Sequence, residues 1–157
     1  MKLSKQGEYG LRAMLYFASQ KGVGTVVGVP PLLQSRNIAQ QEKIPVKFLE
    51  QVLGRLRKAG LLVSQKGAGG GYRLAKPAEK ISLAEVIRAI DGPLAPMLDA
   101  ARLKQLIEKG DPHCGLYNFL LEVRDAIAGI LDKTTLMDVA RKTEECRQKQ
   151  APVMYHI

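Results

Sequence analysis

Residues 44–74, with the sequence IPVKFLEQVLGRLRKAGLLVSQKGAGGGYRL, decide the fold of this chain. Pro45 suits the first turn of a helix, because its ring fixes φ near the helical value. Apolar residues then follow at helical spacing, at Val46, Leu49, Val52, Leu53 and Leu56. We predict a helix that ends near Ala59, with Gly60 in the left-handed conformation after it.

The second half of this stretch predicts a β-hairpin. Residues 61–66 and 72–75 are typical of short strands, and the glycines at 67 and 69–71 indicate a tight turn between them. The other face of the preceding helix carries Lys47, Glu50, Gln51, Arg55 and Lys58. A polar-faced helix followed directly by a basic hairpin is typical of a winged helix, so we interpret these segments as a recognition helix and a wing.

The residues on either side supply the remaining helices of a helix-turn-helix unit. Ser4 is expected to cap a first helix with an apolar stripe at Leu11, Met14, Leu15 and Ala18. Ser35 is expected to cap a short second helix that contains Ile38 and Ala39. A turn at residues 42–43 then leads into the recognition helix.

The C-terminal half predicts further helices. Ser82 and Glu85 form a capping-box pattern before a helix whose buried side is Leu83, Val86, Ile87 and Ile90. Another helix is expected near residues 98–108, and Thr134 or Thr135 is expected to cap a last helix with Leu136, Val139 and Ala140 on its apolar side. Between them lies a heptad pattern, at Leu116, Leu120, Val123, Ile127 and Ile130.

The heptad has two interpretations. It could be a core helix that packs within its own chain, or a helix that pairs with a second copy. We favour the dimer, because a winged helix of residues 1–80 leaves this apolar face without a partner. A two-fold dimer predicts a palindromic DNA site with half-sites about one helical turn apart.

These patterns predict a mainly α fold with a small β-hairpin wing. We expect a winged helix-turn-helix in 1–80, effector and dimerisation helices in 81–147, and a flexible tail in 148–157. Residues 1–80 contain 14 Lys and Arg against 4 Asp and Glu, a net charge of +10, whereas residues 81–157 contain 10 against 11, a net charge of −1. The basic half therefore predicts a polyanion partner such as double-stranded DNA.

Several other classes of protein do not match the sequence. The glycine-rich segment 66–72 lacks the Gly-Lys-Ser/Thr of a phosphate-binding loop and joins two strands, and no Ser/His/acid set suggests catalysis. We find no apolar run of membrane-spanning length and no signal peptide, so we expect a cytoplasmic protein without membrane contact. Cys114 and Cys146, 32 positions apart, form neither a disulfide framework nor a paired metal motif.

Motifs along nearly the whole chain are similar to those of one protein family. They are MKLS at 1–4, YGLRA at 9–13, IA at 38–39, FLEQ at 48–51, LRKAGL at 56–61, GGGYRLA at 69–75, and residues 82–92 and 131–139. In these motifs the chain resembles the bacterial Rrf-type winged-helix transcription regulators, which include regulators of iron–sulfur assembly, the nitric-oxide response and cysteine metabolism. The resemblance implies a homodimeric, sequence-specific DNA-binding regulator, most often a repressor. We expect its signal, a small molecule or a protein, to act near residues 93–115.

The resemblance also implies where DNA is bound. It places the base contacts on Glu50 and its neighbours, and a glutamate can accept a hydrogen bond from cytosine while a glutamine can pair with adenine. The alternative is a plain solvated helix face. The full expected DNA-binding set is Lys5, Tyr9, Ser35, Lys47, Phe48, Glu50, Gln51, Arg55, Lys66, Gly69, Gly70 and Tyr72.

Several relatives bind an iron–sulfur cluster through three cysteines after the Asp-Gly-Pro turn, which here is Asp91 to Pro93. Only Cys114 matches that pattern, and Tyr117 stands where some relatives have a histidine ligand. We therefore expect no metal and no cofactor, and keep Cys114 as a possible sensor. The alternative function is a basic winged helix that serves as a protein-interaction or architectural module without operator specificity.

Overall fold

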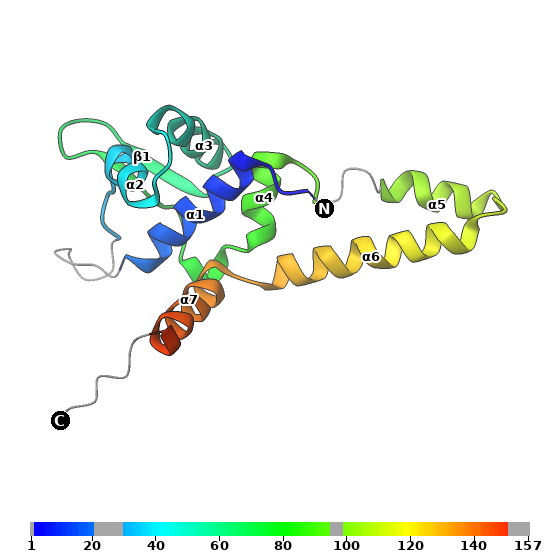
Figure 1. Ribbon diagram of the computed structural model, residues 1–157. Coiled ribbons are helices and arrows are strands. Elements are labelled where there is room, and N and C mark those ends of the chain that lie inside the picture. The colour runs from blue at the N-terminus through cyan, green and yellow to red at the C-terminus, as the bar shows by residue number, and fades with distance from the viewer. Residues whose placement is uncertain (1, 21–29, 95–98, 151–157) are drawn as a thin grey trace, which may run out of the picture.

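The computed structural model describes residues 2–20, 30–94 and 99–150, which form a body and a protruding arm (Figure 1). The body contains the N-terminal helices, the hairpin and the last helix, and the arm consists of α5 and α6. In chain order the elements are α1 (Lys5–Ser19), α2 (Ser35–Glu42), α3 (Val46–Lys58), β1 (Leu62–Gln65), β2 (Gly71–Leu74), a 3-10 turn (Ala78–Lys80), α4 (Leu83–Asp91), α5 (Ala100–Glu108), α6 (Cys114–Lys133) and α7 (Leu136–Gln150).

Helix α3 and the hairpin follow the predicted pattern closely. Leu49, Val52, Leu53 and Leu56 are buried, and Gly60 after the helix has φ +76°. Two details of the prediction are wrong. Val46 is exposed, and Pro45 precedes the helix with an extended ψ of 129°, so it does not form the first helical turn.

The wing is held to the helix-turn-helix by a third extended segment. Strands β1 and β2 pair antiparallel, with Leu62 opposite Leu74 and Gln65 opposite Gly71. Leu33 then pairs with Tyr72 on the far side of β2, through hydrogen bonds of 2.8 and 2.9 Å between their main chains. This pairing fixes the chain before α2.

Ser35 is not the cap of α2, as the sequence predicted. It is the first helical residue, and Gln34 takes the cap position without a side-chain hydrogen bond. The physical reason is the pairing of Leu33 with Tyr72, because it keeps the chain extended up to Gln34 and lets the helix begin at once afterwards. A contact between distant segments therefore sets this boundary.

Helix α1 buries a face that overlaps the predicted one only in part, because Met14 is fully buried while the other three predicted residues pack at the edge of the core. Ser4 caps it as expected, but the buried residues are Gly7, Gly10, Ala13, Met14 and Phe17, while the predicted Leu11, Leu15 and Ala18 are half-buried. The two glycines allow α4 to approach closely. A Cβ atom at position 10 would lie 1.9 Å from Cδ1 of Ile90.

The core continues past residue 80. Ile81, Val86, Ile90 and Leu136 belong to the same hydrophobic cluster as Met14, so α4 and α7 pack with the winged-helix elements.

The Ser82–Glu85 capping box is confirmed, and Thr135 and Asp138 exchange equivalent hydrogen bonds at the start of α7. Residues 148–150 of the expected flexible tail belong to α7, and the rest of that tail lies outside the described residues.

The arm is an antiparallel pair of helices that projects from the body (Figure 1). Asp99 caps α5 through the main-chain N–H groups of Ala101 and Arg102, and Leu98, the expected start of this helix, lies outside the described residues. Helix α6 has no buried residue within the chain. None of the helices in the described ranges is sufficiently long and apolar to cross a membrane.

Candidate nucleic-acid interface

The outer face of α3 presents the side chains that the sequence predicted for base contact. Lys47, Phe48, Glu50 and Gln51 are all exposed, and 47% of Phe48 is accessible to solvent. Their orientation is fixed because the opposite face of α3 is buried in the core. A rigid helix with cationic, amide and carboxylate groups on one free face can enter the major groove and contact base edges.

A groove of about 400 Å³ lies between the start of α2 and the wing. Ser35 and Arg36 line one side, and Lys66, Gly70 and Tyr72 line the other. None of the residues lining the groove is acidic, so the groove suits an anion such as a backbone phosphate.

Two arginines of this groove were missed in the sequence. Arg36 follows Ser35, and Arg57 reaches the groove from α3 and donates a hydrogen bond of 3.3 Å to Oγ of Ser64. In the sequence, their positive charge was the one indication that they could bind an anion. Only the packing of α2 against the wing shows that they share a surface with Lys66.

The glycines at the tip of the wing differ in their surroundings. Gly69 is exposed, and a Cβ atom there would meet no atom within 4 Å. Gly70 is buried, and a Cβ atom there would lie 2.2 Å from the carbonyl oxygen of Gln65. Gly70 is therefore required for the turn itself, whereas Gly69 leaves space beside the tip for another molecule.

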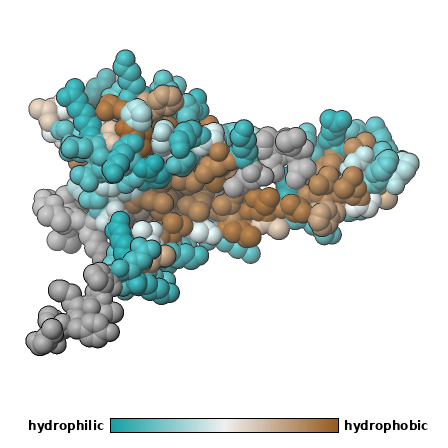
Figure 2. Space-filling model, in the orientation of Figure 1, coloured by the Kyte–Doolittle hydropathy of each residue, from teal (hydrophilic) through white to brown (hydrophobic). Residues whose placement is uncertain are grey.

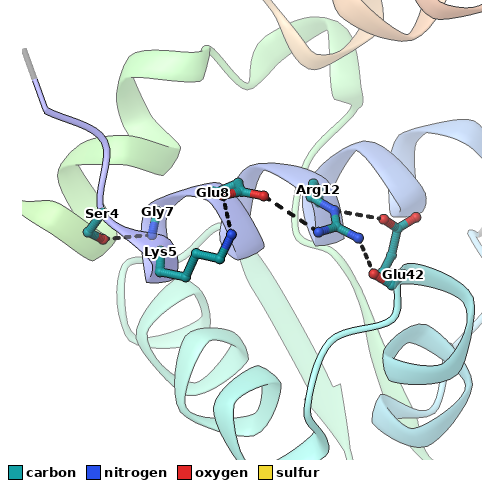
Figure 3. Close-up of polar contacts among 6 residues, drawn as sticks. All are labelled: Ser4, Lys5, Gly7, Glu8, Arg12 and Glu42. Atoms are coloured by element: carbon teal, nitrogen blue, oxygen red, sulfur yellow. Dashed lines mark hydrogen bonds and ion pairs between the residues drawn. The ribbon is translucent and has the colours of Figure 1, made fainter.

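Lys5 lies in a separate polar cluster at the start of α1 (Figure 3), and Tyr9 is next to it. The Lys5 ammonium lies 3.0 Å from a carboxylate oxygen of Glu8 and 5.5 Å from the centre of the Tyr9 ring. The hydrogen bond between Lys5 and Glu8 raises the pKa of Lys5 and lowers the pKa of Glu8. Arg12 lies 3.6 Å from Glu8 and 3.3 Å from Glu42, and it donates to the Glu42 carbonyl as well (Figure 3). This arginine joins α1 to the end of α2.

Arg55 has a partner that the sequence did not indicate. Its Nη1 donates a hydrogen bond of 3.0 Å to the main-chain carbonyl of Ile90, in the last turn of α4. The residue lies on α3 with Lys47 and Gln51, but its guanidinium is bound within the protein. Arg55 is exposed like Lys47, Phe48, Glu50 and Gln51, which form the exposed group at residues 47–51, but it differs from them in this hydrogen bond to α4.

The expected sensor residue lies at the far end of the arm. Cys114 is an exposed free thiol at the start of α6, and Cys146 is an exposed free thiol on α7. Nδ1 of His113 lies 3.2 Å from Oδ1 of Asp111. In residues 2–20, 30–94 and 99–150, no three His, Cys, Asp or Glu side chains are grouped so that they could hold a metal ion. The chain has two cysteines in all, so its residues do not fit a cluster bound by three cysteines of one chain.

The heptad residues lie along the arm. Leu116, Val123 and Ile130 are exposed, and Leu120 and Ile127 are half-buried. Ile130 is 67% exposed, and Phe119, about three turns earlier on α6, is 59% exposed. Figure 2 shows the resulting apolar strip along α6. Packing within the part of the chain that the structure describes therefore leaves much of this face exposed to solvent.

Comparison with known proteins agrees with this architecture. The model of the family Rrf2, described as iron-dependent transcriptional regulator, matches residues 3–142. The HTH-type transcriptional regulator CymR of Bacillus subtilis is 34% identical over 157 residues, which are 100% of both chains. The regulator IscR of Escherichia coli is 35% identical over 146 residues, covering 92% of this chain and 83% of that one.

A solved structure gives the same result for the fold. The structure of CymR, the global cysteine regulator of B. subtilis, superposes with a TM-score of 0.73 at 31% identity, covering 90% of this chain and 98% of that one. The family and these relatives are described as transcriptional regulators, in agreement with the expectation of a regulator and not an enzyme. The winged-helix fold and the match over residues 3–142 show that this chain belongs to the Rrf2 family of DNA-binding transcriptional regulators.

Proposed function

We propose that this protein is a homodimeric repressor that binds a palindromic operator and releases it in response to a signal. The observation that carries the proposal is the exposed group at residues 47–51 of α3, on the same winged helix as a groove whose lining includes three cationic residues and no acidic one. Bacterial operators lie in the cytoplasm, where we expect the protein to act.

The two parts of the interface have different roles in the proposal. Glu50 and Gln51 select bases in the major groove, because their side chains carry the acceptor and amide groups that base edges distinguish. Arg36, Arg57 and Lys66 bind the backbone, since a phosphate contact orients the protein without reading sequence. Lys5 and Tyr9 add contacts at the flank.

The apolar face of α6 supports a dimer. An uncovered row of Leu, Val and Ile along a 20-residue helix is unusual on a monomer surface, and a two-fold axis would cover the row with its own copy. Pairing through α6 places two bodies side by side, so their recognition helices can enter successive turns of a duplex.

The signal is proposed to act on the arm and the segment that leads into it, at residues 93–115. A small molecule or a partner protein could shift the dimer there, provided that it binds one dimer geometry more tightly than the other. Cys114 is placed for a redox signal because its thiol is exposed. We propose no metal and no cofactor, because the donor set does not fit one.

The test is a gel-shift selection from genomic DNA fragments at increasing salt concentration. A repressor enriches a small set of fragments that share a palindrome and keeps its preference for them as salt rises. Steeply salt-dependent binding without any enriched sequence would contradict the proposal and favour an architectural module. For the sensor, a Cys114→Ser variant should bind the enriched fragment equally with and without peroxide, whereas the native protein should not.

A further inference from the structure

We infer that Arg55 is a positioning residue for operator recognition: it orients the recognition helix by binding the end of α4 and does not contact DNA. This inference rests on the proposed function, and it concerns how that function is controlled. It departs from the interpretation of Arg55 as part of the cationic surface of α3.

The first argument is the hydrogen bond of Arg55. Its Nη1 donates to the carbonyl oxygen of Ile90 at 3.0 Å, and this bond is partly buried although the Arg55 residue as a whole is exposed. Carbonyl groups in the last turn of a helix have no partner within the helix, and the negative end of the helix dipole attracts a guanidinium. The contact therefore gives the Ile90 carbonyl a hydrogen-bond partner, and it also restrains α3 relative to α4.

The second argument is that the end of α4 is itself fixed on α1. The Asp91 carboxylate accepts a hydrogen bond of 2.9 Å from the Ser4 main-chain N–H and another from the Ser4 hydroxyl. Ile90 packs directly on Gly10 of α1. We call the four residues Ser4, Arg55, Ile90 and Asp91 the α4 junction. It joins α1, α3 and α4 through hydrogen bonds and one apolar contact.

The third argument is the place of the junction in the chain. Gly92, with φ +82°, ends α4, and the chain continues from there to the arm. Arg88, one turn earlier in α4, forms an ion pair with Asp132 at the base of α6. A displacement of the arm would therefore reach the last turns of α4 through this ion pair. Arg55 lies one helical turn beyond Gln51, so it transmits that displacement to the exposed group at residues 47–51.

The test compares Arg55→Met with Lys58→Met. Both variants remove one positive charge from α3, and Lys58 is an exposed residue in the last turn of that helix. Binding is measured on two probes over a range of salt: the most enriched genomic fragment and a random-sequence duplex of the same length. Thermal unfolding checks that each variant is folded.

A positioning role predicts that Arg55→Met binds the enriched fragment about tenfold more weakly, with unchanged affinity for the random duplex and an unchanged salt slope. A phosphate contact predicts instead that both affinities fall together and that the salt slope decreases by about one. The second pattern for Arg55→Met would overturn the inference. If Lys58 binds a phosphate, Lys58→Met lowers the affinity for both probes and decreases the salt slope by about one, and this result gives the size of the effect that a lost phosphate contact has in this protein.

Asp91→Asn adds a test with the opposite sign of charge. Loss of a negative charge strengthens generic attraction to DNA, so a simple electrostatic effect predicts equal or tighter binding to both probes. The junction predicts weaker binding to the enriched fragment alone, and tighter binding to it would overturn the inference.

If this variant fails to fold, the Arg55→Met result decides. If the native protein enriches no fragment, the proposed function fails; an enriched fragment with a reduced salt slope for Arg55→Met contradicts only the role of Arg55.

Discussion

Arg88 and Asp132 form a two-point ion pair that fastens the arm to the body. Nη1 and Nη2 of Arg88 lie 2.5 and 3.1 Å from the two carboxylate oxygens of Asp132, across 44 positions in the sequence. The pair joins α4 to the last turn of α6. Next to it in the sequence, Leu131 of α6 packs against a hydrophobic cluster that contains Ala84 and Ile87 of α4.

Replacing Asp132 with Ala should loosen this attachment by a small amount. The two side chains are 44% and 45% exposed, and ion pairs in such positions contribute about 0.2–1 kcal/mol to the free energy of unfolding. Urea denaturation should show a loss in this range, with faster amide exchange in the last turn of α6. Lys133→Ala, one residue along, is the control. An equal loss in the control would show that the ion pair itself contributes nothing.

The protein should lose stability in acid. A hydrogen bond from Arg88 lowers the pKa of Asp132. Burial alone would raise the pKa of Glu85, but hydrogen bonds from Lys76 and the Ser82 main chain outweigh burial and lower it. A carboxyl with a lowered pKa in the folded state stabilises fully above its unfolded pKa, near 4, and this contribution is lost as pH falls through the folded value.

The urea midpoint should therefore decrease between about pH 5 and pH 3, and less so in Glu85→Gln, because that variant has no charge to lose. Glu122→Gln on the exposed side of α6 is the matched control. The expectation is wrong if the Glu85→Gln and native curves run parallel over this range.

Gly10 should be a position where alanine is harmful despite its better helix propensity. Its Cβ atom would lie 1.9 Å from Cδ1 of Ile90 and force that side chain to move, at a cost of about 1–3 kcal/mol. Ile90→Val removes Cδ1, so the double variant should recover most of the loss caused by Gly10→Ala. Thermal or urea unfolding of the four proteins in this cycle measures the coupling between the two positions.

Gly54→Ala is the same substitution in open surroundings. No atom lies within 4 Å of the Cβ position in α3, so alanine should stabilise the helix by about 0.5–1 kcal/mol. Equal effects of alanine at positions 10 and 54 would show that contact with Ile90 is unimportant.

The same residues show why the sequence predicted some features and not others. The caps at Ser4 and Ser82 and the glycine at position 60 depend on neighbours within a few residues, and the structure confirms all three. The exposed face of α3 was found for the same reason. Local periodicity is enough for features of this kind.

Apart from the local errors at Pro45 and Val46, the missed features join distant segments. Gly10 was not predicted as a core position because a glycine adds no hydrophobic signal, and only the approach of Ile90 reveals its role. The pairing of Leu33 with Tyr72 and the bond from Arg55 to Ile90 span about 35 to 40 residues. No pattern within one helix or strand contains that information.

The dimer can be tested by placing a charge on the apolar strip of α6. Ile130→Glu would bury two carboxylates at a two-fold interface, one from each copy, and should raise the dimer dissociation constant at least about 100-fold. Sedimentation equilibrium measures this change. Asn118→Glu adds the same charge on the other side of the helix and should leave association unchanged. A native protein that sediments as a monomer at micromolar concentration would contradict the dimer.

Glu50 is the strongest candidate for sequence discrimination, because a carboxylate on a DNA-facing helix repels phosphate and is favourable only beside a base that donates to it. Glu50→Gln should therefore reduce the preference at one base pair of each half-site by about 1–3 kcal/mol, and it should bind a random duplex equally or more tightly. Competition binding against single-base variants of the enriched fragment measures both effects. Glu79→Gln makes the same change on an exposed residue of the 3-10 turn and should alter no base preference. Identical profiles for the two variants would mean that Glu50 contributes only charge, and that base selection must then come from Gln51 or Lys47.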